Sequence, residues 1–289
     1  MGGVMARVLC LHGIGQQYAG ERELHASWYP AAGDGLTRAG AAPLTPSDLS
    51  CVFYGDLFRP PGRTLSLLAP PLDASDVTDG YETELLLALW AEAARTDDAV
   101  VPPDARTLAR APLAVQRALN ALSRSRFFAG LALRAMVLDL KQVRAYLCDP
   151  DVRSAVQARV VDAVTADTRV VVGHSLGSVV AYEALCAHPE WPVRSLLTLG
   201  SPLGVRGLVF DRLRAGDGGK PGDWPGSVRS WTNIADEGDV VALVKDLRPL
   251  FGERVKGHLV HNGSSAHDAT RYLNTREAGQ AVADEQGPG

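Results

Sequence analysis

A serine stands between two glycines at residues 173–177, Gly-His-Ser-Leu-Gly. The bare Gly-x-Ser-x-Gly pattern is weak, but its surroundings strengthen it. Valines 170–172 end at Gly173 as a buried strand would, and apolar residues then recur at helical spacing until His188. A sharp turn between strand and helix lifts a serine hydroxyl off a sheet, and larger side chains two positions away would collide with it. The pattern predicts that Ser175 is a nucleophile; an ordinary turn is the alternative.

A serine nucleophile needs a general base at neutral pH, and the base needs an acid to orient it. Where a serine follows such a turn, the expected chain order is Ser, then Asp or Glu, then His. The acid should lie in the loop just past a strand that ends near Ile234. Asp239 is the predicted acid, and Asp236 is the alternative. The aspartate that is not used is predicted to cap the loop.

Three histidines follow this loop, and position separates them. His258 and His261 lie in or at the end of a strand pattern, where a structural role with satisfied hydrogen bonds is expected. His267 follows the Gly-Ser-Ser loop at 263–265 and precedes a short helix with Tyr272. A histidine beyond the last strand can reach back over the edge of the sheet, so His267 is the predicted base.

The residues 12–15, His-Gly-Ile-Gly, follow the first apolar run. In a serine hydrolase the loop at this place supplies one donor to the oxyanion. The predicted pair of donors is the backbone N–H groups of Ile14 and Leu176, and a glycine-rich turn without a ligand is the alternative. A dinucleotide fingerprint fails because Tyr18 stands where Gly or Ala belongs. A phosphate-binding Walker loop fails because Pro221 follows Gly219-Lys220.

Short apolar runs could form the strands that position these residues. None alternates strictly, which is typical of strands buried on both faces of a parallel sheet. Helical patterns lie between the runs, so an α/β fold with a mostly parallel central sheet flanked by helices is predicted. The runs are 8–11, 51–54, 170–172 and 196–199, with weaker candidates at 229–234 and 255–261.

Residues 56–167 are far too long for an ordinary connection between two strands. Their pattern is mostly helical, so a helical insertion before the nucleophile strand is predicted within one domain spanning 1–289. The insertion suggests a cap with an acyl-chain pocket formed by residues 65–68 and Phe127-Phe128. Plain core packing is the alternative.

The composition argues against several classes of function. Of 289 residues, 46% are apolar and 21% charged, with a formal net charge of −4 and no block of Lys or Arg, which argues against a nucleic-acid partner. No apolar run reaches the ~18–20 residues of a transmembrane segment, and residues 1–11 lack the basic start of a secretory signal. The expected location is cytoplasmic, with all four cysteines reduced. No His/Cys/Asp cluster has metal-ligand spacing, so neither a metal nor a cofactor is predicted.

Taken together, these pieces resemble the α/β-hydrolase superfamily, and within it lipase- and esterase-like serine hydrolases. The resemblance covers about 7–55 and 168–273 and leaves 56–167 unexplained. An Asp-x-x-Asp-Pro-Val segment of such lipases uses its second aspartate, which corresponds to Asp239, although Val240 replaces the proline. The matching pieces are 11–15, 173–178, Gly-Ser-Pro at 200–202, 236–241 and His267.

The resemblance implies a triad of Ser175, Asp239 and His267 that cleaves carboxylic esters through an acyl-enzyme. Small-molecule or lipid esters, phospholipids among them, fit this interpretation, as does a peripheral contact with a membrane. Acyl transfer and thioester or amide hydrolysis share the same intermediate and remain open. So does a non-catalytic or partner-activated protein on this fold. The sequence leaves the oligomeric state open.

Overall fold

Six parallel strands form the centre of the molecule in the computed structural model, which describes residues 7–59, 72–78, 80–104, 111–126 and 133–284. The order across the sheet is β2-β1-β3-β4-β5-β6, and every neighbouring pair is parallel. The predicted α/β class is confirmed, with a sheet that is wholly parallel in the described residues. The strands are β1 (Val8–Leu11), β2 (Leu49–Val52), β3 (Val170–His174), β4 (Ser195–Leu199), β5 (Ser230–Asp236) and β6 (Val255–Val260).

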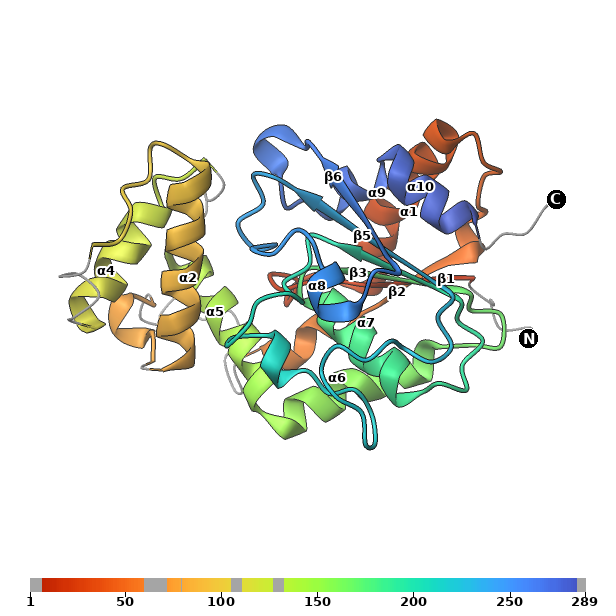
Figure 1. The fold of residues 1–289 in the computed structure, drawn as a ribbon, viewed down its shortest axis with the longest axis horizontal. Helices are drawn as coiled ribbons and strands as arrows, with labels where there is room; N and C mark the ends of the chain where they lie inside the picture. The colour runs from red at the N-terminus through yellow and green to blue at the C-terminus, as the bar shows by residue number, and fades with distance from the viewer. Residues whose placement is uncertain (1–6, 60–71, 79, 105–110, 127–132, 285–289) are drawn as a thin grey trace.

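The inner strands β1, β3 and β4 are mainly apolar, as is typical where helices cover both faces of a sheet (Figure 1). Along β1, Val8 and Cys10 pack into the cluster on the side of α1, whereas Leu9 and Leu11 pack into the cluster on the side of α7. This alternation is the two-residue period of a strand. The edge strand β6 differs, since most of its residues are exposed.

The helices divide between the two faces. On one face α1 packs against α9 and α10, and on the other α7 lies along β1 and β3 with α6 beside it. The helices are α1 (Glu21–Ala39), α2 (Tyr81–Thr96), α4 (Ala111–Leu122), α5 (Leu133–Cys148), α6 (Pro150–Ala163), α7 (Leu176–Ala187), α8 (Arg248–Phe251), α9 (Ala269–Leu273) and α10 (Arg276–Ala283).

Local sequence accounts for several element boundaries. Asp149 caps α6 by accepting the N–H groups of Asp151 and Val152, and Pro150 suits the first helical turn. The second strand begins and ends two residues earlier than the predicted run 51–54. Tyr54 leaves the ladder because its backbone N–H donates to the His12 ring instead.

The chain between β2 and β3 contributes α2, α4, α5 and α6. In Figure 1, α2 and α4 lie away from the sheet at one side, with α5 next to α2. Helix α6 packs against α7 and β2, so it belongs to the layer that covers the sheet. One apolar cluster runs from Leu11 and Val179 to Leu86 and Leu119, which joins these helices to the sheet. The predicted pocket residues 65–68 and Phe127-Phe128 lie outside the described residues.

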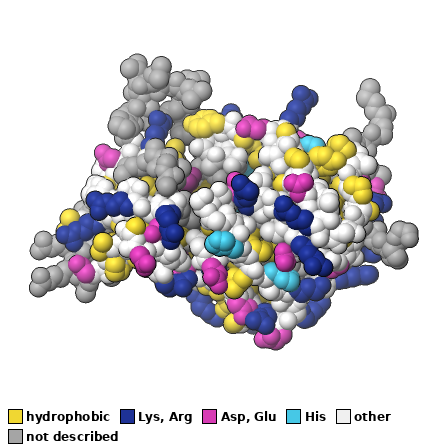
Figure 2. Space-filling view, turned by 90° about the horizontal axis from the view of Figure 1, so that it is seen from above, with side chains coloured by type: hydrophobic (Ala, Val, Ile, Leu, Met, Phe, Trp, Pro, Cys, Tyr) yellow, Lys and Arg dark blue, Asp and Glu magenta, His cyan; other side chains and the backbone are white. Residues whose placement is uncertain are grey.

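Acidic and basic side chains lie among one another on the face seen in Figure 2. Within the described ranges, no helix combines the length and the apolar character needed to cross a membrane. The four cysteines are free thiols. Cys10 and Cys51 lie opposite each other on the neighbouring strands β1 and β2.

Candidate active site

Ser175 lies at the turn between β3 and α7, with backbone angles φ 53° and ψ −127°. Among the described residues it is the only non-glycine with a positive φ. Such a conformation is strained for an L-residue and persists only where the surroundings enforce it. Here the Ser175 N–H donates to Leu199 O at 2.9 Å, and Ser178 Oγ donates to Ser175 O at 2.6 Å. The serine is 2% exposed.

The glycines on either side of Ser175 leave no room for a side chain, as the sequence predicts. A Cβ atom at Gly173 would lie 2.5 Å from Ser178 Cα, and one at Gly177 would lie 2.2 Å from Leu11 O. Helix α7 can therefore approach β1 only because residue 177 is a glycine. The close approach keeps the turn sharp and holds Ser175 at the carboxyl end of the sheet.

Asp239 and His267 meet at the carboxyl ends of β5 and β6. His267 lies in the loop between β6 and α9, and its Nδ1 is 2.7 Å from Asp239 Oδ2. Gly200, at φ 54° after β4, makes room for the pair, because a Cβ there would lie 2.7 Å from Asp239 Oδ2. Ser175 and His267 line the same cavity. The structure thus brings the three predicted residues to one end of the sheet.

The Asp239 carboxylate is fully buried and has several hydrogen-bond donors. Tyr272 Oη donates to Oδ2 at 2.7 Å, while the N–H groups of Val241 and Ala242 donate to Oδ1 at 2.9 and 3.3 Å. Burial opposes ionisation, but the His267 ring and these donors outweigh it, so the pKa of Asp239 lies below its ordinary value. Asp239 is therefore a carboxylate at neutral pH.

Tyr272 is a residue that sequence reasoning missed as part of the site. Its hydroxyl donates to Asp239 and accepts the Asp236 N–H at 2.9 Å, so it joins the end of β5 to the acid. Burial and the Asp239 charge raise the pKa of Tyr272, which keeps the hydroxyl protonated as a donor. The only signal in the sequence was its place five residues after His267.

Asp236, the alternative acid, ties two loops together. Its Oδ1 accepts the Gly238 N–H at 2.7 Å, and its Oδ2 accepts the N–H of Asn262. Both carboxylate oxygens are used by backbone donors, and no hydrogen bond joins Asp236 to a histidine in the described residues. The structure therefore gives Asp236 the loop-capping arrangement predicted for the aspartate that is not used.

The backbone N–H groups of Ile14 and Leu176 belong to residues that line the same cavity as Ser175. Within the described part of the chain, neither N–H donates a hydrogen bond to another residue. The loop 12–15 lies against the serine, because a Cβ at Gly13 would be 2.7 Å from Ser175 Cβ. The two amides can thus serve a negatively charged oxygen that forms beside Ser175.

His12 holds this loop in place. Its Nδ1 lies 2.7 Å from Gly13 O, and its Nε2 accepts the Tyr54 N–H at 3.2 Å. Burial lowers the pKa of His12 to about 4, so the ring is neutral and its proton is on Nδ1. His12 thus has a structural role in this loop through its hydrogen bonds to backbone groups.

His174, the residue between Gly173 and Ser175, supports His267. Its Nε2 lies 2.8 Å from the His267 carbonyl oxygen, and the centroids of the two rings are 4.6 Å apart. Because a carbonyl oxygen only accepts, His174 Nε2 carries the proton. Burial, and then the His267 ring, lower the pKa of His174 to about 3. Nothing in the sequence around Ser175 indicated this contact.

His258 and His261 have the strand positions that the sequence predicts. Both are exposed, on and just after the edge strand β6. A sheet edge leaves one side of a strand open to solvent, which accounts for their exposure.

A cavity of about 540 Å³ opens above Ser175. Its walls are mainly aliphatic, and helices α2 and α5 supply one side of it. The described wall residues on these two helices include Leu85, Leu86, Leu89, Met136, Leu140 and Val143. Such a cavity favours the binding of an apolar group next to the serine hydroxyl.

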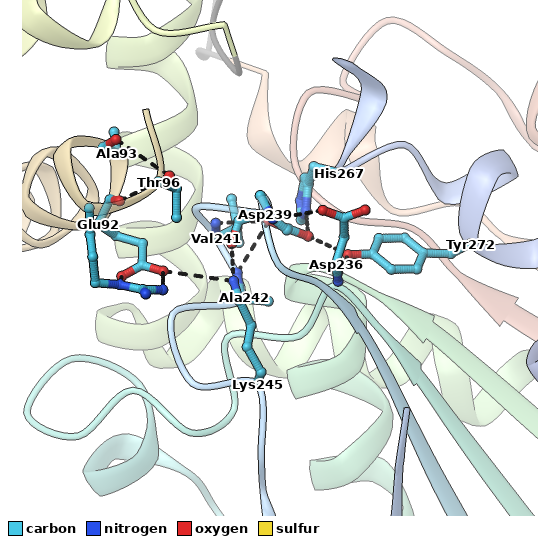
Figure 3. A network of polar contacts seen from close by, with 12 residues as sticks. Glu92, Ala93, Thr96, Asp236, Asp239, Val241, Ala242, Lys245, His267 and Tyr272 are labelled. Carbon is cyan, nitrogen blue, oxygen red and sulfur yellow. Dashed lines mark hydrogen bonds and ion pairs between the residues drawn. The ribbon is translucent and has the colours of Figure 1, made fainter. Parts of the chain in front are cut away.

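Lys245 connects the acid-bearing loop to α2, as Figure 3 shows. Its Nζ donates to the backbone carbonyl of Asp239 and lies 3.8 Å from Glu92 Oε1. Glu92 also accepts two hydrogen bonds from Arg95 on the same helix. The helices between β2 and β3 are thereby linked to the loop that carries the acid.

No group of three or more His, Cys, Asp or Glu side chains that could hold a metal ion occurs in the ranges that the structure describes. Comparison of the chain with models of protein families, with curated proteins and with solved structures finds no match. The geometry of the site is therefore the basis for assigning its chemistry.

Proposed function

We propose that this protein is a serine hydrolase that cleaves carboxylic esters by acyl transfer to Ser175. One observation carries the proposal. A serine in a strained turn shares a cavity with a histidine whose Nδ1 is 2.7 Å from a buried aspartate. This is the arrangement of nucleophile, base and orienting acid that activates a hydroxyl.

Each residue has a distinct role in the proposed reaction. Ser175 Oγ attacks the ester carbonyl carbon while His267 Nε2 takes its proton, and the N–H groups of Ile14 and Leu176 stabilise the oxyanion. Collapse of the tetrahedral intermediate breaks the C–O bond, and His267 returns the proton to the departing alcohol. Water then attacks the acyl-enzyme by the same route, which releases the acid and restores Ser175.

The proposal extends to the fold. The order β2-β1-β3-β4-β5-β6 and the position of Ser175 after β3 support an α/β-hydrolase architecture. Helices α2, α4 and α5 would then be a helical cap inserted before the nucleophile strand. The aliphatic walls that α2 and α5 contribute beside Ser175 support esters with an apolar acyl chain.

The test combines labelling with turnover. A fluorophosphonate probe should label Ser175 in the wild-type protein, and Ser175→Ala should lose both labelling and the hydrolysis of p-nitrophenyl octanoate. The expected loss in kcat is on the order of 10⁶-fold, and the oxyanion donors and substrate binding should leave a residual rate about 10³-fold above the uncatalysed reaction. His267→Gln should lose comparable activity, since Gln cannot accept the serine proton.

His258→Gln is the matched control, because His258 is exposed on β6. It should keep wild-type turnover. Undiminished hydrolysis by Ser175→Ala would refute the proposal, and so would a wild-type protein that neither reacts with the probe nor turns over any ester. Thioester and amide analogues of the octanoyl substrate distinguish the other acyl-transfer reactions that the same residues could perform.

A further inference from the structure

An aspartate interrupts the apolar side of α5 that faces the cavity. Met136, Leu140 and Val143 line the cavity at helical spacing, and Asp139 occupies the position between them that completes the i, i+3, i+4, i+7 pattern. Transfer of a carboxyl group from water to an apolar surface is unfavourable unless a partner compensates. A carboxyl group among these apolar side chains is therefore expected to have a partner that compensates for its lost contact with water.

Among the residues that the structure describes, none is a hydrogen-bond or ion-pair partner of this carboxyl group. Within the described ranges, no hydrogen bond or ion pair joins Asp139 to another residue, although it senses the charge of His267. Gln142, one turn further along α5, does hold the structure together: its Oε1 accepts the Gly15 N–H at 3.2 Å, and its Nε2 donates to Gln17. Asp139 thus has no such structural contact and faces the cavity instead.

The position of Asp139 indicates which part of the substrate its carboxyl group would contact. A Cβ atom at Gly15 would be 3.9 Å from Asp139 Oδ1, so the carboxyl group lies beside the loop 12–15 as well as within electrostatic reach of His267. His267 must protonate the departing alcohol, so the alcohol part of an ester lies next to its ring. Asp139 therefore faces the space that the alcohol part occupies.

We propose that Asp139 determines specificity by hydrogen bonding to a free hydroxyl in the alcohol part of the substrate, so that the preferred substrates are apolar acyl esters of a polyol. This inference rests on the proposed ester hydrolysis at Ser175. Some polar groups in a binding site form a hydrogen bond only when the correct substrate is bound. Such a group discriminates strongly against analogues that lack the matching group.

A hydroxyl suits Asp139 better than an ammonium group does. Burial raises the pKa of Asp139 to about 7, with His267 opposing the rise, so both protonation states are populated at neutral pH. A hydroxyl can donate to the carboxylate and accept from the acid, whereas an ammonium group pairs only with the carboxylate. No Phe, Tyr or Trp lies among the described residues that line the cavity, so an aromatic partner for a cation is missing there.

The experiment compares two esters that differ in the hydroxyls of their alcohol part, 1-octanoyl glycerol and propyl octanoate. The wild-type protein should show a kcat/KM about 10- to 100-fold higher for the glycerol ester, which is the range expected from one hydrogen bond to a charged group. Asp139→Leu should bring this ratio close to one, chiefly by slowing the glycerol ester. Asp139→Asn should keep part of the preference, because its amide can still accept and donate.

A short alkyl fluorophosphonate without hydroxyl groups provides the control for folding. It should label Ser175 at similar rates in the wild-type protein and both Asp139 variants. With labelling intact, a wild-type ratio near one overturns the inference, and so does an unchanged ratio in Asp139→Leu. Faster turnover of 3-aminopropyl octanoate than of the glycerol ester would mean that Asp139 recognises a cation and not a hydroxyl. Loss of labelling in both variants would mean that Asp139 has a structural role. Absence of both labelling and ester turnover in the wild-type protein refutes the proposed function itself.

Discussion

Asp236 and Asp239 are three residues apart and chemically identical, yet their carboxylates accept hydrogen bonds from different groups. Asp239 accepts hydrogen bonds through Oδ2 from His267 and Tyr272, so its charge acts on the ring. Asp236 accepts two backbone N–H groups, from Gly238 and Asn262. A carboxylate can orient an imidazole only if it contacts the ring, so Asp239 alone satisfies the geometry.

Replacement of Asp239 by Asn should therefore reduce kcat far more than replacement of Asp236. An amide keeps the shape of Asp239 but favours the wrong histidine tautomer, and the same change in a serine protease triad reduces kcat about 10⁴-fold. Asp236→Asn should change kcat less than about tenfold, because it affects loop contacts only. Steady-state kinetics on p-nitrophenyl octanoate measures both, with Ser175 labelling as the check on folding. A larger loss in Asp236→Asn would reverse the assignment of the acid.

At the scale of elements, α2 and the loop after β5 are coupled through one lysine. Lys245 reaches from this loop to Glu92 on α2 and also donates to the backbone of Asp239. Burial lowers the pKa of Lys245, while Asp239 and Glu92 oppose the shift. The helices over the cavity and the acid of the site thus share a polar contact, in addition to their common apolar cluster.

Lys245→Met should weaken this connection while keeping the length and the apolar stem of the side chain. We expect a loss of about 1–3 kcal/mol in the free energy of unfolding, the usual effect of removing a partly buried hydrogen bond to a charged group. A several-fold drop in kcat should accompany it, because the Asp239 backbone loses a donor. Chemical denaturation and ester kinetics provide the two measurements.

Lys256→Met on β6 is the matched control, since Lys256 is half exposed and its ion pair with Asp284 spans 3.7 Å. Its effect on unfolding should stay within about 0.5 kcal/mol, as is usual for exposed pairs. Equal effects of the two substitutions would mean that the contact between Lys245 and Glu92 does not couple the helix to the loop.

At the scale of the whole molecule, two histidines are buried in neutral form. The pKa of His12 is lowered to about 4 and that of His174 to about 3, in both cases mainly by burial. In the unfolded chain both titrate near the ordinary value of about 6.5. Between these limits the two rings bind up to two more protons in the unfolded state, and Asp139, whose pKa is raised to about 7, binds about one more in the folded state, so on balance acid favours unfolding.

The free energy of unfolding should accordingly be retained above about pH 6.5 and should fall as the pH decreases from there toward about 4. Each of the two histidines contributes a slope of about 1.4 kcal/mol per pH unit once the pH is well below 6.5. Urea denaturation between pH 7 and pH 4.5 measures the effect. His174→Gln should flatten the dependence by about one proton. A constant free energy of unfolding over this range would show that the two rings are not both buried in neutral form.

Sequence patterns alone were enough for the α/β class and for most strands. The buried runs at 8–11 and 170–172 lie within β1 and β3, because continuous apolar character over four or five residues is a local property of the chain. The turn at Ser175 was predictable for the same reason. Its glycines and flanking periodicities lie within a few residues, and steric exclusion at Gly173 and Gly177 acts over that distance.

The rest of the site was decided by tertiary structure. The sequence favoured Asp239 and His267 only by their positions in loops, and it did not indicate that His258 and His261 are exposed. It offered no sign that Tyr272 and His174 contact these two residues, and Asp139 was hidden in an apolar stripe. The physical reason is that a hydrogen bond or a desolvated carboxyl group depends on which distant elements meet at the carboxyl ends of the strands. Packing of the whole chain determines these contacts between distant elements. A strand, a turn or a helix, in contrast, follows from its own residues.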